Sequence, residues 1–343
     1  YWSCGSAIRD NTVRTLSPFG TSVLSLPKIN SDAFGSVATF NKTSTKNMQT
    51  TKVVLIGCGK MGTAIAEGLL STASPRQRIW NIKACVRSTT TYDRLMAHPL
   101  HMNNTSTFIP VLATDLAALP AYIHPAALVV LATKPRDAIV ILQNQEVRNA
   151  LRGKLLISVV FGMSEDLILS HLSPETAIVS ALPNLAASAG QSATITAASP
   201  SSAGNDLGSS HSAGRGFDAS TDALCLDFLS SIGRVFPLQP AAFGPGAVLS
   251  GTMPAFVSEF VAGLLDAATA LGVDRDAAKA IVQQGLRGTA DLLDRHDNPL
   301  DIVDQVATKG GVTEAGLNVL REGKIKETAS NALLRSESKL RGQ

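Results

Sequence analysis

The sequence predicts an α/β fold built on a doubly wound, mainly parallel sheet, followed by an all-helical domain. Three observations lead to this prediction. A glycine-rich turn, Gly57 to Gly62, joins an apolar strand to an apolar-striped helix. Apolar segments of strand length then alternate with helical segments as far as Leu238, which is the order found in parallel sheets. From about Gln239 onwards the pattern is nearly all helical.

The bulk composition suits a globular protein of two domains. The chain has 343 residues, of which 45% are hydrophobic and 17% charged. Its net charge of +3 is too small to indicate a nucleic-acid or membrane partner, and no apolar run approaches the roughly 20 residues that span a bilayer. The cysteines form no Cys-x-x-Cys pair and the histidines have no ligand spacing, so we expect no metal site. Scattered cysteines suit a reducing compartment, and we expect a cytoplasmic protein.

Residues 1–47 differ from the rest of the chain. They are rich in Ser, Thr and Asn, carry more basic than acidic residues and show no sustained periodicity. The chain does not begin with Met, and Met48 directly precedes the first strand. We therefore expect residues 1–50 to be a disordered leader or an artefact of the gene model. A mitochondrial transit peptide has a similar composition and would place the protein in mitochondria instead.

The glycine turn has the Gly-x-Gly-x-x-Gly spacing of a dinucleotide-binding site. Gly57 allows the tight turn, Gly59 lets the backbone approach a pyrophosphate, and Gly62 lets the helix pack close to the strand. The helix N-terminus, with Lys60 and Met61, directs unpaired N–H groups at the phosphates. An apolar strand precedes the turn and a helix follows it. Both favour a dinucleotide-binding Rossmann domain over a glycine-rich turn in an unrelated α/β protein.

The end of the second predicted strand, Ile79–Val86, selects the cofactor. No Asp or Glu occurs between Trp80 and Tyr92, so the acid that would hydrogen-bond the ribose of NAD is missing. Arg87 and the hydroxyl of Ser88 suit the 2′-phosphate of NADP instead. We therefore expect NADPH, with NADH as the alternative cofactor. Arg87 could also be simply a solvated surface residue.

Three later apolar strands are predicted to end beside the glycine turn, after a short strand at Phe108–Leu112. They are Ala127–Leu131, Lys154–Val160 and Thr176–Leu182. Ligands of open parallel sheets bind outside the carboxyl ends of the strands, so these ends should line the nicotinamide half of the site. The residues at these ends are Ala132, Thr133, Lys134, Pro135, Phe161, Gly162, Pro183 and Asn184.

A low-complexity Gly/Ser/Ala stretch, Ser199–Asp222, is expected to be a flexible surface insertion. A helix at Leu224–Ser231 and a strand at Arg234–Leu238 follow it. The first domain is thus predicted to span residues 51–239.

The second domain, residues 240–343, is predicted to be a set of apolar-striped helices. They are expected at Pro254–Leu271, Arg275–Leu293, Pro299–Val306, Glu314–Arg321 and Lys324–Leu340. A tight glycine turn at residues 308–313 precedes the fourth helix. About a hundred residues of such helices seldom bury all their stripes alone, so we expect a homodimer through this domain, or a larger homo-oligomer.

Five ordered motifs between Lys52 and the C-terminus carry a family resemblance. They are Gly57-Cys-Gly-Lys-Met-Gly62, Val129-Val-Leu-Ala-Thr-Lys-Pro135, Leu182-Pro-Asn184, Leu249-Ser-Gly-Thr-Met-Pro-Ala-Phe256 and Asp304-Gln-Val-Ala-Thr-Lys-Gly-Gly-Val-Thr313. With these motifs the chain resembles the pyrroline-5-carboxylate reductases, which carry out the last step of proline synthesis. The chain departs from the family pattern at Lys309, where the family has Pro, and at Met253, where it has Gly.

The resemblance implies an NAD(P)H-dependent oxidoreductase that reduces the cyclic imine 1-pyrroline-5-carboxylate to L-proline by hydride transfer to its C=N bond. It implies that Thr313 is the catalytic residue, hydrogen-bonded at the imine nitrogen. An N-cap role for Thr313 is compatible with this one. The residues implied to bind the substrate, with backbone N–H groups around its carboxylate, are Thr308, Lys309, Gly310, Gly311 and Val312.

Three other functions stay open. A paralogous reductase could act on another cyclic imino acid, such as a piperideine carboxylate, because the sequence does not show the volume of the ring pocket. A β-hydroxyacid dehydrogenase shares the glycine turn but needs a catalytic Lys on its interdomain helix, and Pro254–Leu271 contains none. A homologue that binds nucleotide without turnover is disfavoured by the intact motifs.

Overall fold

The fold is that of a computed structural model. The structure describes residues 49–71, 78–99, 106–197 and 218–342. Most of the predicted leader and most of the predicted insertion lie outside these residues. The first strand begins at Thr50, at the end of the segment assigned to the leader.

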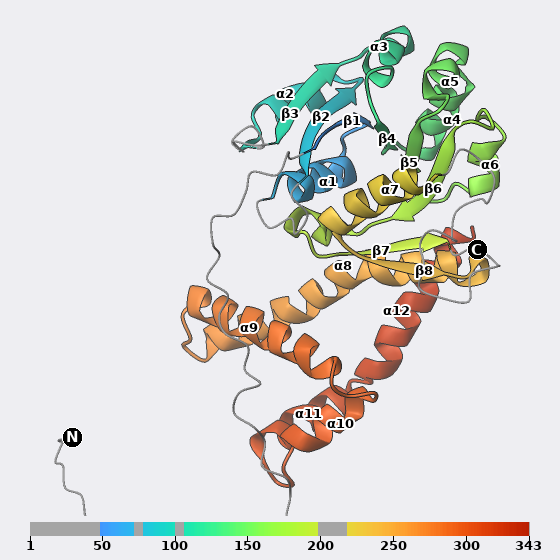
Figure 1. The fold of residues 1–343 in the computed structure, drawn as a ribbon. Helices are drawn as coiled ribbons and strands as arrows, with labels where there is room; N and C mark the ends of the chain where they lie inside the picture. Colours follow the sequence, from blue (N-terminus) through green and yellow to red (C-terminus); the bar gives the residue numbers. More distant parts are fainter. Residues whose placement is uncertain (1–48, 72–77, 100–105, 198–217, 343) are drawn as a thin grey trace, which may run out of the picture. The chain divides into compact units, whose positions relative to one another are not determined.

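An eight-stranded sheet organises the first part of the chain (Figure 1). Its strands are β1 (Thr50–Ile56), β2 (Ile79–Val86), β3 (Thr107–Leu112), β4 (Leu128–Leu131), β5 (Leu155–Ser158), β6 (Ala177–Leu182), β7 (Ser192–Ala197) and β8 (Gly233–Leu238). Their spatial order is β3-β2-β1-β4-β5-β6-β7-β8. Neighbours are parallel from β3 to β6, β7 is antiparallel to β6, and β8 is parallel to β7. The order 3-2-1-4-5-6 is that of the doubly wound dinucleotide-binding fold, which confirms the predicted fold class.

Helices cover both faces of this sheet (Figure 1). They are α1 (Lys60–Leu70), α2 (Thr89–Met96), α3 (Leu119–Ile123), α4 (Pro135–Gln143), α5 (Gln145–Leu151), α6 (Glu165–Leu169) and α7 (Ala219–Ser231), with 3-10 turns η3 (Leu116–Ala118) and η4 (Leu185–Ala189). Successive side chains of a strand point to opposite faces. Accordingly, Val53 and Leu55 of β1 belong to the core beneath α1 and α7, whereas Val54 and Ile56 belong to the core beneath α3, α4 and α5.

The structure corrects the predicted bounds around the insertion. Helix α7 begins at Ala219, five residues before the predicted Leu224, and Asp218 caps it by accepting a hydrogen bond from Thr221 N. Residues 218–222 are therefore a helix start, not part of a flexible insertion. Strand β7 was not predicted. Its Ser-Ala-Thr-Ile-Thr-Ala sequence alternates, but the fully buried positions are the polar ones, Ser192, Thr194 and Thr196.

Five helices make up the C-terminal part. They are α8 (Pro240–Ala270), α9 (Arg275–Leu293), α10 (Pro299–Val306), α11 (Val312–Glu322) and α12 (Ile325–Leu340). Helix α8 contacts the sheet edge, where Ser250 Oγ donates to Ala193 O over 2.5 Å. The predicted start of this helix at Pro254 is wrong, since α8 begins at Pro240 and runs through Pro245 and Pro254.

Helix α8 is, within the described part of the chain, the one helix that is long and apolar enough to cross a membrane by length and composition. Its mean hydropathy reaches 1.5 over 18 residues, and only Ala247, Val248 and Ser250 of its 31 residues are buried. The sequence predicted no such segment, because it placed the helix start at Pro254. One helix of this kind is weak evidence for a membrane span, and a partner subunit is another way to cover its apolar surface.

Candidate active site

A cavity of about 580 Å³ lies at the carboxyl ends of β1, β2, β3 and β4. This is the place where open parallel sheets bind their ligands. Nine of the predicted cofactor residues line it, namely Gly57, Gly59, Lys60, Met61, Arg87, Ser88, Ala132, Thr133 and Lys134. The other three, Gly62, Pro135 and Asn184, do not line it.

The glycine turn that forms one wall of the cavity is required by local packing at two of its three glycines. Gly57 has φ +86°, and a Cβ there would lie 2.6 Å from Thr133 Cγ2. A Cβ at Gly62 would lie 2.7 Å from Gly57 O, so only glycine lets α1 start this close to the end of β1. Gly59 differs, because a Cβ there would meet no described atom within 4 Å. Chain packing does not explain Gly59, and a glycine here leaves room for the close approach of a ligand.

The N-terminus of α1 provides an anion site in this wall. Gly59 is the N-cap, no side chain caps the helix, and its first turn holds no acidic residue. The charged residues that line the cavity are the basic Lys60, Arg87 and Lys134 and the acidic Asp137. Unpaired helix N–H groups and an excess of basic side chains suit the phosphates of a dinucleotide.

The hydroxyl of Thr133 is a further polar group of the cavity wall. Its Oγ1 is buried and has no hydrogen-bond partner among the described residues. Buried polar atoms without a partner are rare in folded proteins. A bound nucleotide that reaches this wall would supply the missing partner, so the residues present fit the predicted cofactor.

The residues expected to read the 2′-phosphate lie at the end of β2, as predicted, but an acid faces them. Arg87 Nη1 lies 3.1 Å from Asp137 Oδ1, and the two side chains are 76% and 37% exposed. Ser88 Oγ accepts a hydrogen bond from Thr91 N and so caps α2. Asp137 was missed because it comes from α4, 50 residues along the chain from Arg87.

Two thiols in the cavity wall are expected to be unreactive. Burial raises the pKa of Cys58 to about 11 and the pKa of Cys85 to about 12, so both thiols are neutral at pH 7. Thiolates, not thiols, are nucleophiles and metal ligands. The described residues contain no group of three His, Cys, Asp or Glu side chains that could hold a metal ion.

Some of the wall was not predicted. Ala113 and Thr114, which follow β3, line the cavity, as do Val140 and Ile141 of α4. The strand preceding Ala113 was predicted at Phe108–Leu112. The rule that ligands bind at the carboxyl ends of parallel strands would therefore have predicted Ala113 and Thr114 as well.

Of the three strand ends expected to line the nicotinamide half, the one at Ala132–Lys134 lines this cavity, and the ends at Phe161–Gly162 and Pro183–Asn184 do not. Asn184 is buried at the end of β6, where its Nδ2 donates to Ser250 O over 3.1 Å and its Oδ1 accepts from Ala186 N. These bonds tie β6 and η4 to α8. Phe161 and Leu185, beside these strand ends, are 46% and 54% exposed. The carboxyl edge of the sheet therefore presents exposed apolar side chains near the ends of β5 and β6.

The predicted substrate loop, residues 308–313, also lies outside the cavity wall of its own chain. Helix α11 begins at Val312 with Gly311 as its N-cap, so the N-cap role considered for Thr313 is wrong. Val312 is 92% exposed. Gly310 N donates to Glu314 Oε2 over 2.6 Å, so an acidic side chain of the same chain contacts one of the N–H groups assigned to the substrate carboxylate.

Comparisons with known proteins match the two parts of the chain separately. Residues 242–342 match the family model for pyrroline-5-carboxylate reductase dimerisation. Residues 52–162 match the model described as NADP oxidoreductase, coenzyme F420-dependent. A pyrroline-5-carboxylate reductase of Acremonium sp is 27% identical over 310 residues, which cover 84% of this chain and 92% of the relative. One of Penicillium fellutanum is 29% identical, over 80% of this chain and 86% of the relative.

Solved structures share the fold over most of the chain. A pyrroline carboxylate reductase of Plasmodium falciparum with NADP bound superposes with a TM-score of 0.65 and 21% identity, covering 86% of this chain and 98% of that chain. The 1-pyrroline-5-carboxylate reductase of Streptococcus pyogenes gives a TM-score of 0.64 and 22% identity, covering 86% and 99%. Over 80% or more of its length, the chain is therefore similar to pyrroline-5-carboxylate reductases.

Proposed function

We propose that the protein is an NAD(P)H-dependent reductase that converts 1-pyrroline-5-carboxylate to L-proline. The observation that carries the proposal is the phosphate cradle at the N-terminus of α1, in a cavity lined by Lys60, Arg87 and Lys134. The similarity to pyrroline-5-carboxylate reductases supports the choice of substrate. The two functional regions proposed are a cofactor domain, residues 51–239, and a helical domain, residues 240–343.

The residues of the cavity bind and orient the cofactor. When bound, the reduced nicotinamide supplies a hydride to the imine carbon. The N–H groups at the start of α1 and the Lys60 and Lys134 ammonium groups offset the charge of the pyrophosphate. Arg87 and Ser88 contact the 2′-phosphate of NADPH, and Thr133 Oγ1 hydrogen-bonds the nucleotide beside Ala132. The proposed cofactor is NADPH, with NADH as the weaker alternative.

The loop before α11 binds the substrate. Thr313, at the second position of α11, hydrogen-bonds the imine nitrogen, and the N–H groups of Gly310, Gly311 and Val312 hold the carboxylate. The imine arrives protonated, and hydride addition to its carbon gives the secondary amine without a general base. The Glu314 carboxylate must leave Gly310 N when the substrate carboxylate binds there.

The protein acts as a homodimer through its C-terminal helices in this proposal. No residue of the 308–313 loop lines the cofactor cavity of the same chain. A second copy that covers the exposed helices can bring its loop to the open carboxyl edge of the sheet. The small-molecule imine and a second copy of the chain are therefore the two proposed partners. The proposed location is the cytoplasm, since three free and buried cysteines, Cys58, Cys85 and Cys225, suit a reducing compartment.

The experiment mixes purified protein with 1-pyrroline-5-carboxylate and NADPH and follows the absorbance of the reduced cofactor. NADH and the six-membered piperideine carboxylate run in parallel. We expect rapid oxidation with the five-membered imine. Thr313→Ala should lower kcat on the order of 100-fold, because one hydrogen bond to the reacting group is lost. Thr313→Ser keeps the hydroxyl and is the matched control.

Each other outcome would assign the protein a different function. Turnover with the larger ring alone would keep the fold and the residue roles but make the chain a paralogous imine reductase. If no imine is reduced while NADPH still binds, the assignment as an enzyme fails and the chain is a nucleotide-binding homologue.

A further inference from the structure

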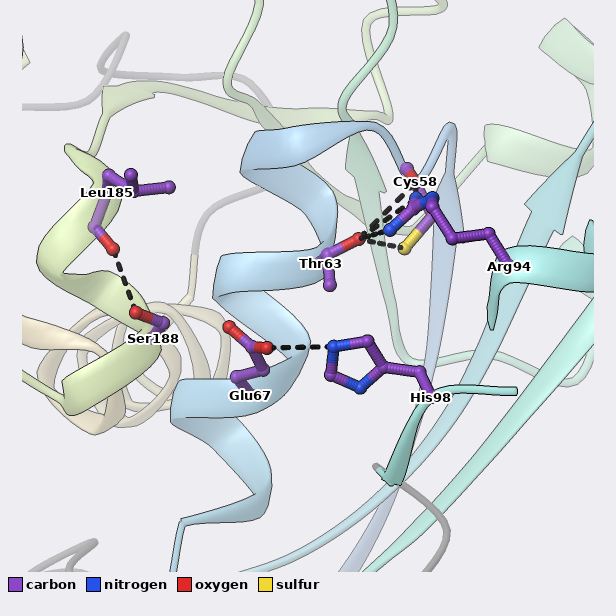
Figure 2. Close-up of polar contacts among 7 residues, drawn as sticks. All are labelled: Cys58, Thr63, Glu67, Arg94, His98, Leu185 and Ser188. Carbon is purple, nitrogen blue, oxygen red and sulfur yellow. Dashed lines mark hydrogen bonds and ion pairs between the residues drawn. The ribbon is translucent and has the colours of Figure 1, made fainter. Parts of the chain in front are cut away.

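An arginine from outside the glycine turn holds that turn in place. Arg94, on α2, reaches α1 and the turn before it (Figure 2). Its Nη2 donates to Cys58 O over 2.7 Å, and its Nη1 and Nη2 lie 3.4 and 3.3 Å from Thr63 Oγ1. The planar guanidinium thus contacts two oxygens at once, one in the turn and one in the first helical turn of α1, which a lysine could not do with the same geometry.

The contact at Cys58 fixes the direction of an N–H group that the cofactor needs. In a trans peptide the carbonyl oxygen and the following N–H point in opposite directions, and the described residues contain no cis peptide. With Cys58 O held on the α2 side, Gly59 N–H points away from Arg94. Cys58 and Gly59 both line the cavity, and Gly59 is the N-cap of α1. We propose that Arg94 is a positioning residue that presets the Cys58–Gly59 peptide for the pyrophosphate of NAD(P)H.

The charge of Arg94 suits this task as well as its geometry. A turn that approaches a pyrophosphate must keep its carbonyl oxygens away from the phosphate oxygens, because both carry negative charge. A guanidinium bound to Cys58 O offsets the negative end of that peptide dipole, and hydrogen bonds from a charged donor are stronger than neutral ones. A Cβ at Gly59 would meet no described atom within 4 Å, so no side-chain packing fixes this peptide.

A second polar contact between the same two segments provides a control. His98 Nε2 lies 3.2 Å from Glu67 Oε1 (Figure 2). Glu67 follows Thr63 by one helical turn on α1, and His98 lies just beyond the C-cap of α2, four residues after Arg94. The His98–Glu67 contact joins the same segments but neither residue lines the cavity. A change there tests whether joining the segments is enough.

A direct role for Arg94 is the competing explanation. If the side chain swings to the 2′-phosphate, it would act on NADPH and not on NADH. If it acts through Gly59, it affects the pyrophosphate, which both nucleotides carry. The ratio of the two binding losses therefore separates positioning from direct contact.

The test measures the dissociation constants of NADPH and NADH for the full chain by titration calorimetry, with no imine present. Arg94→Met should weaken both nucleotides by a similar factor, roughly tenfold or more. Arg94→Lys, which keeps the charge but not the two-pronged contact, should give a smaller loss for both. Glu67→Gln should leave both constants unchanged. Melting temperatures without nucleotide show whether each variant is folded.

Three results would overturn the proposal. A loss confined to NADPH would mean direct contact with the 2′-phosphate. Unchanged constants for a folded Arg94→Met variant would mean that the contact only stabilises the fold. An equal loss in Glu67→Gln would mean that any link between the segments suffices. If Arg94→Met does not fold, Arg94→Lys decides by the same criteria. Because no imine is used, failure of the proposed reductase activity would leave this test intact.

Discussion

At the scale of single residues, we expect Arg87 and Asp137 to set the preference of the cavity between NADPH and NADH. Their side chains pair at 3.1 Å on the surface, where such a pair contributes at most about 1 kcal/mol. The 2′-phosphate of NADPH can therefore displace Asp137. We expect Arg87→Ala to raise the KM for NADPH about tenfold or more and to change the KM for NADH little, measured in the imine-reduction assay. Asp137→Asn should lower the KM for NADPH, because it removes a competitor of the phosphate.

The control is an arginine in the same kind of pair at another place. Arg152 Nε lies 2.7 Å from Glu175 Oε2, both side chains are exposed, and neither lines the cavity. Arg152→Ala should change neither KM. Equal losses for NADPH and NADH in Arg87→Ala would show that Arg87 does not read the 2′-phosphate.

At the scale of elements, the turn between β1 and α1 contains one glycine required for packing, Gly62, and one that we expect to be required for nucleotide binding, Gly59. A Cβ at Gly62 would collide with Gly57 O, so Gly62→Ala should cost about 1–3 kcal/mol of unfolding free energy. A Cβ at Gly59 would meet no described atom within 4 Å, and Gly59 has φ −73°, which any residue adopts. Gly59→Ala should keep the wild-type melting temperature but weaken NADPH binding about tenfold or more. A lowered melting temperature in Gly59→Ala would contradict this division.

The N-cap of α7 makes the stability of this helix depend on pH. Asp218 accepts hydrogen bonds from Thr221 N, Ser220 Oγ and Thr221 Oγ1, which lower its pKa from 3.8 to about 2. Because the pKa is lower in the folded state, the ionised cap stabilises α7 above about pH 4. This stabilisation is lost as the pH falls towards 2.

The prediction is a pH-dependent difference in melting temperature followed by circular dichroism. Asp218→Ala should melt below the wild type at pH 6, and the two curves should converge near pH 2. Asp218→Asn keeps an uncharged cap and should melt between them at pH 6. A constant difference at all pH values would show that the charge of Asp218 is not used.

The elements also show how far local sequence rules reach. Strand β1, the glycine turn and α1 were predicted together, because apolar alternation, glycine spacing and helix periodicity agree there. Strand β7 was not predicted. Its threonines are buried by tertiary contacts, which no local sequence pattern reveals. Helix α8 was predicted too short because Pro245 and Pro254 are helix breakers by local rules. At Gly246 a Cβ would overlap Leu238, so packing on β8 fixes this part of α8.

The candidate site was predictable where it follows strand ends and unpredictable where it depends on the assembled fold. Nine of the residues predicted to bind the cofactor line the cavity, because the glycine turn and the carboxyl ends of parallel strands meet at one edge. Asp137 escaped prediction because its meeting with Arg87 depends on how α4 packs. The amide of Asn184 is bonded to Ser250 O of α8, a contact between residues 66 positions apart.

At the scale of the whole molecule, the C-terminal helices leave a large apolar surface uncovered. Large apolar side chains from α8 to α12 are exposed, among them Leu249, Met253, Phe260, Leu264, Leu271, Ile281, Leu286, Leu293, Leu300, Val306, Val319 and Leu334. Contiguous apolar surfaces of this kind mark protein interfaces. Because residues 242–342 match a dimerisation family model, we propose that a second copy of the chain covers these side chains.

If that second copy also completes the active site, two defective chains should restore each other. A chain with Gly59→Val lacks the cofactor cradle, and a chain with Thr313→Ala lacks the imine contact. In a mixed dimer, the intact cradle of one chain meets the intact loop of the other. With random pairing at equal amounts, half of the dimers are mixed and each holds one intact site. Co-expression should therefore restore about a quarter of the wild-type activity.

The deciding comparison is between two defects carried on separate chains and the same two defects carried on one chain. Co-expression of wild type with the double variant, Gly59→Val and Thr313→Ala in one chain, measures the effect of exchange alone. Size-exclusion chromatography with light scattering confirms that the mixed sample is assembled. If each site were complete within one chain, a mixed dimer would hold two damaged sites, and its activity would not exceed the mean of the two parents. Restored activity requires that the cavity at the end of β1 and the loop before α11 meet across two copies.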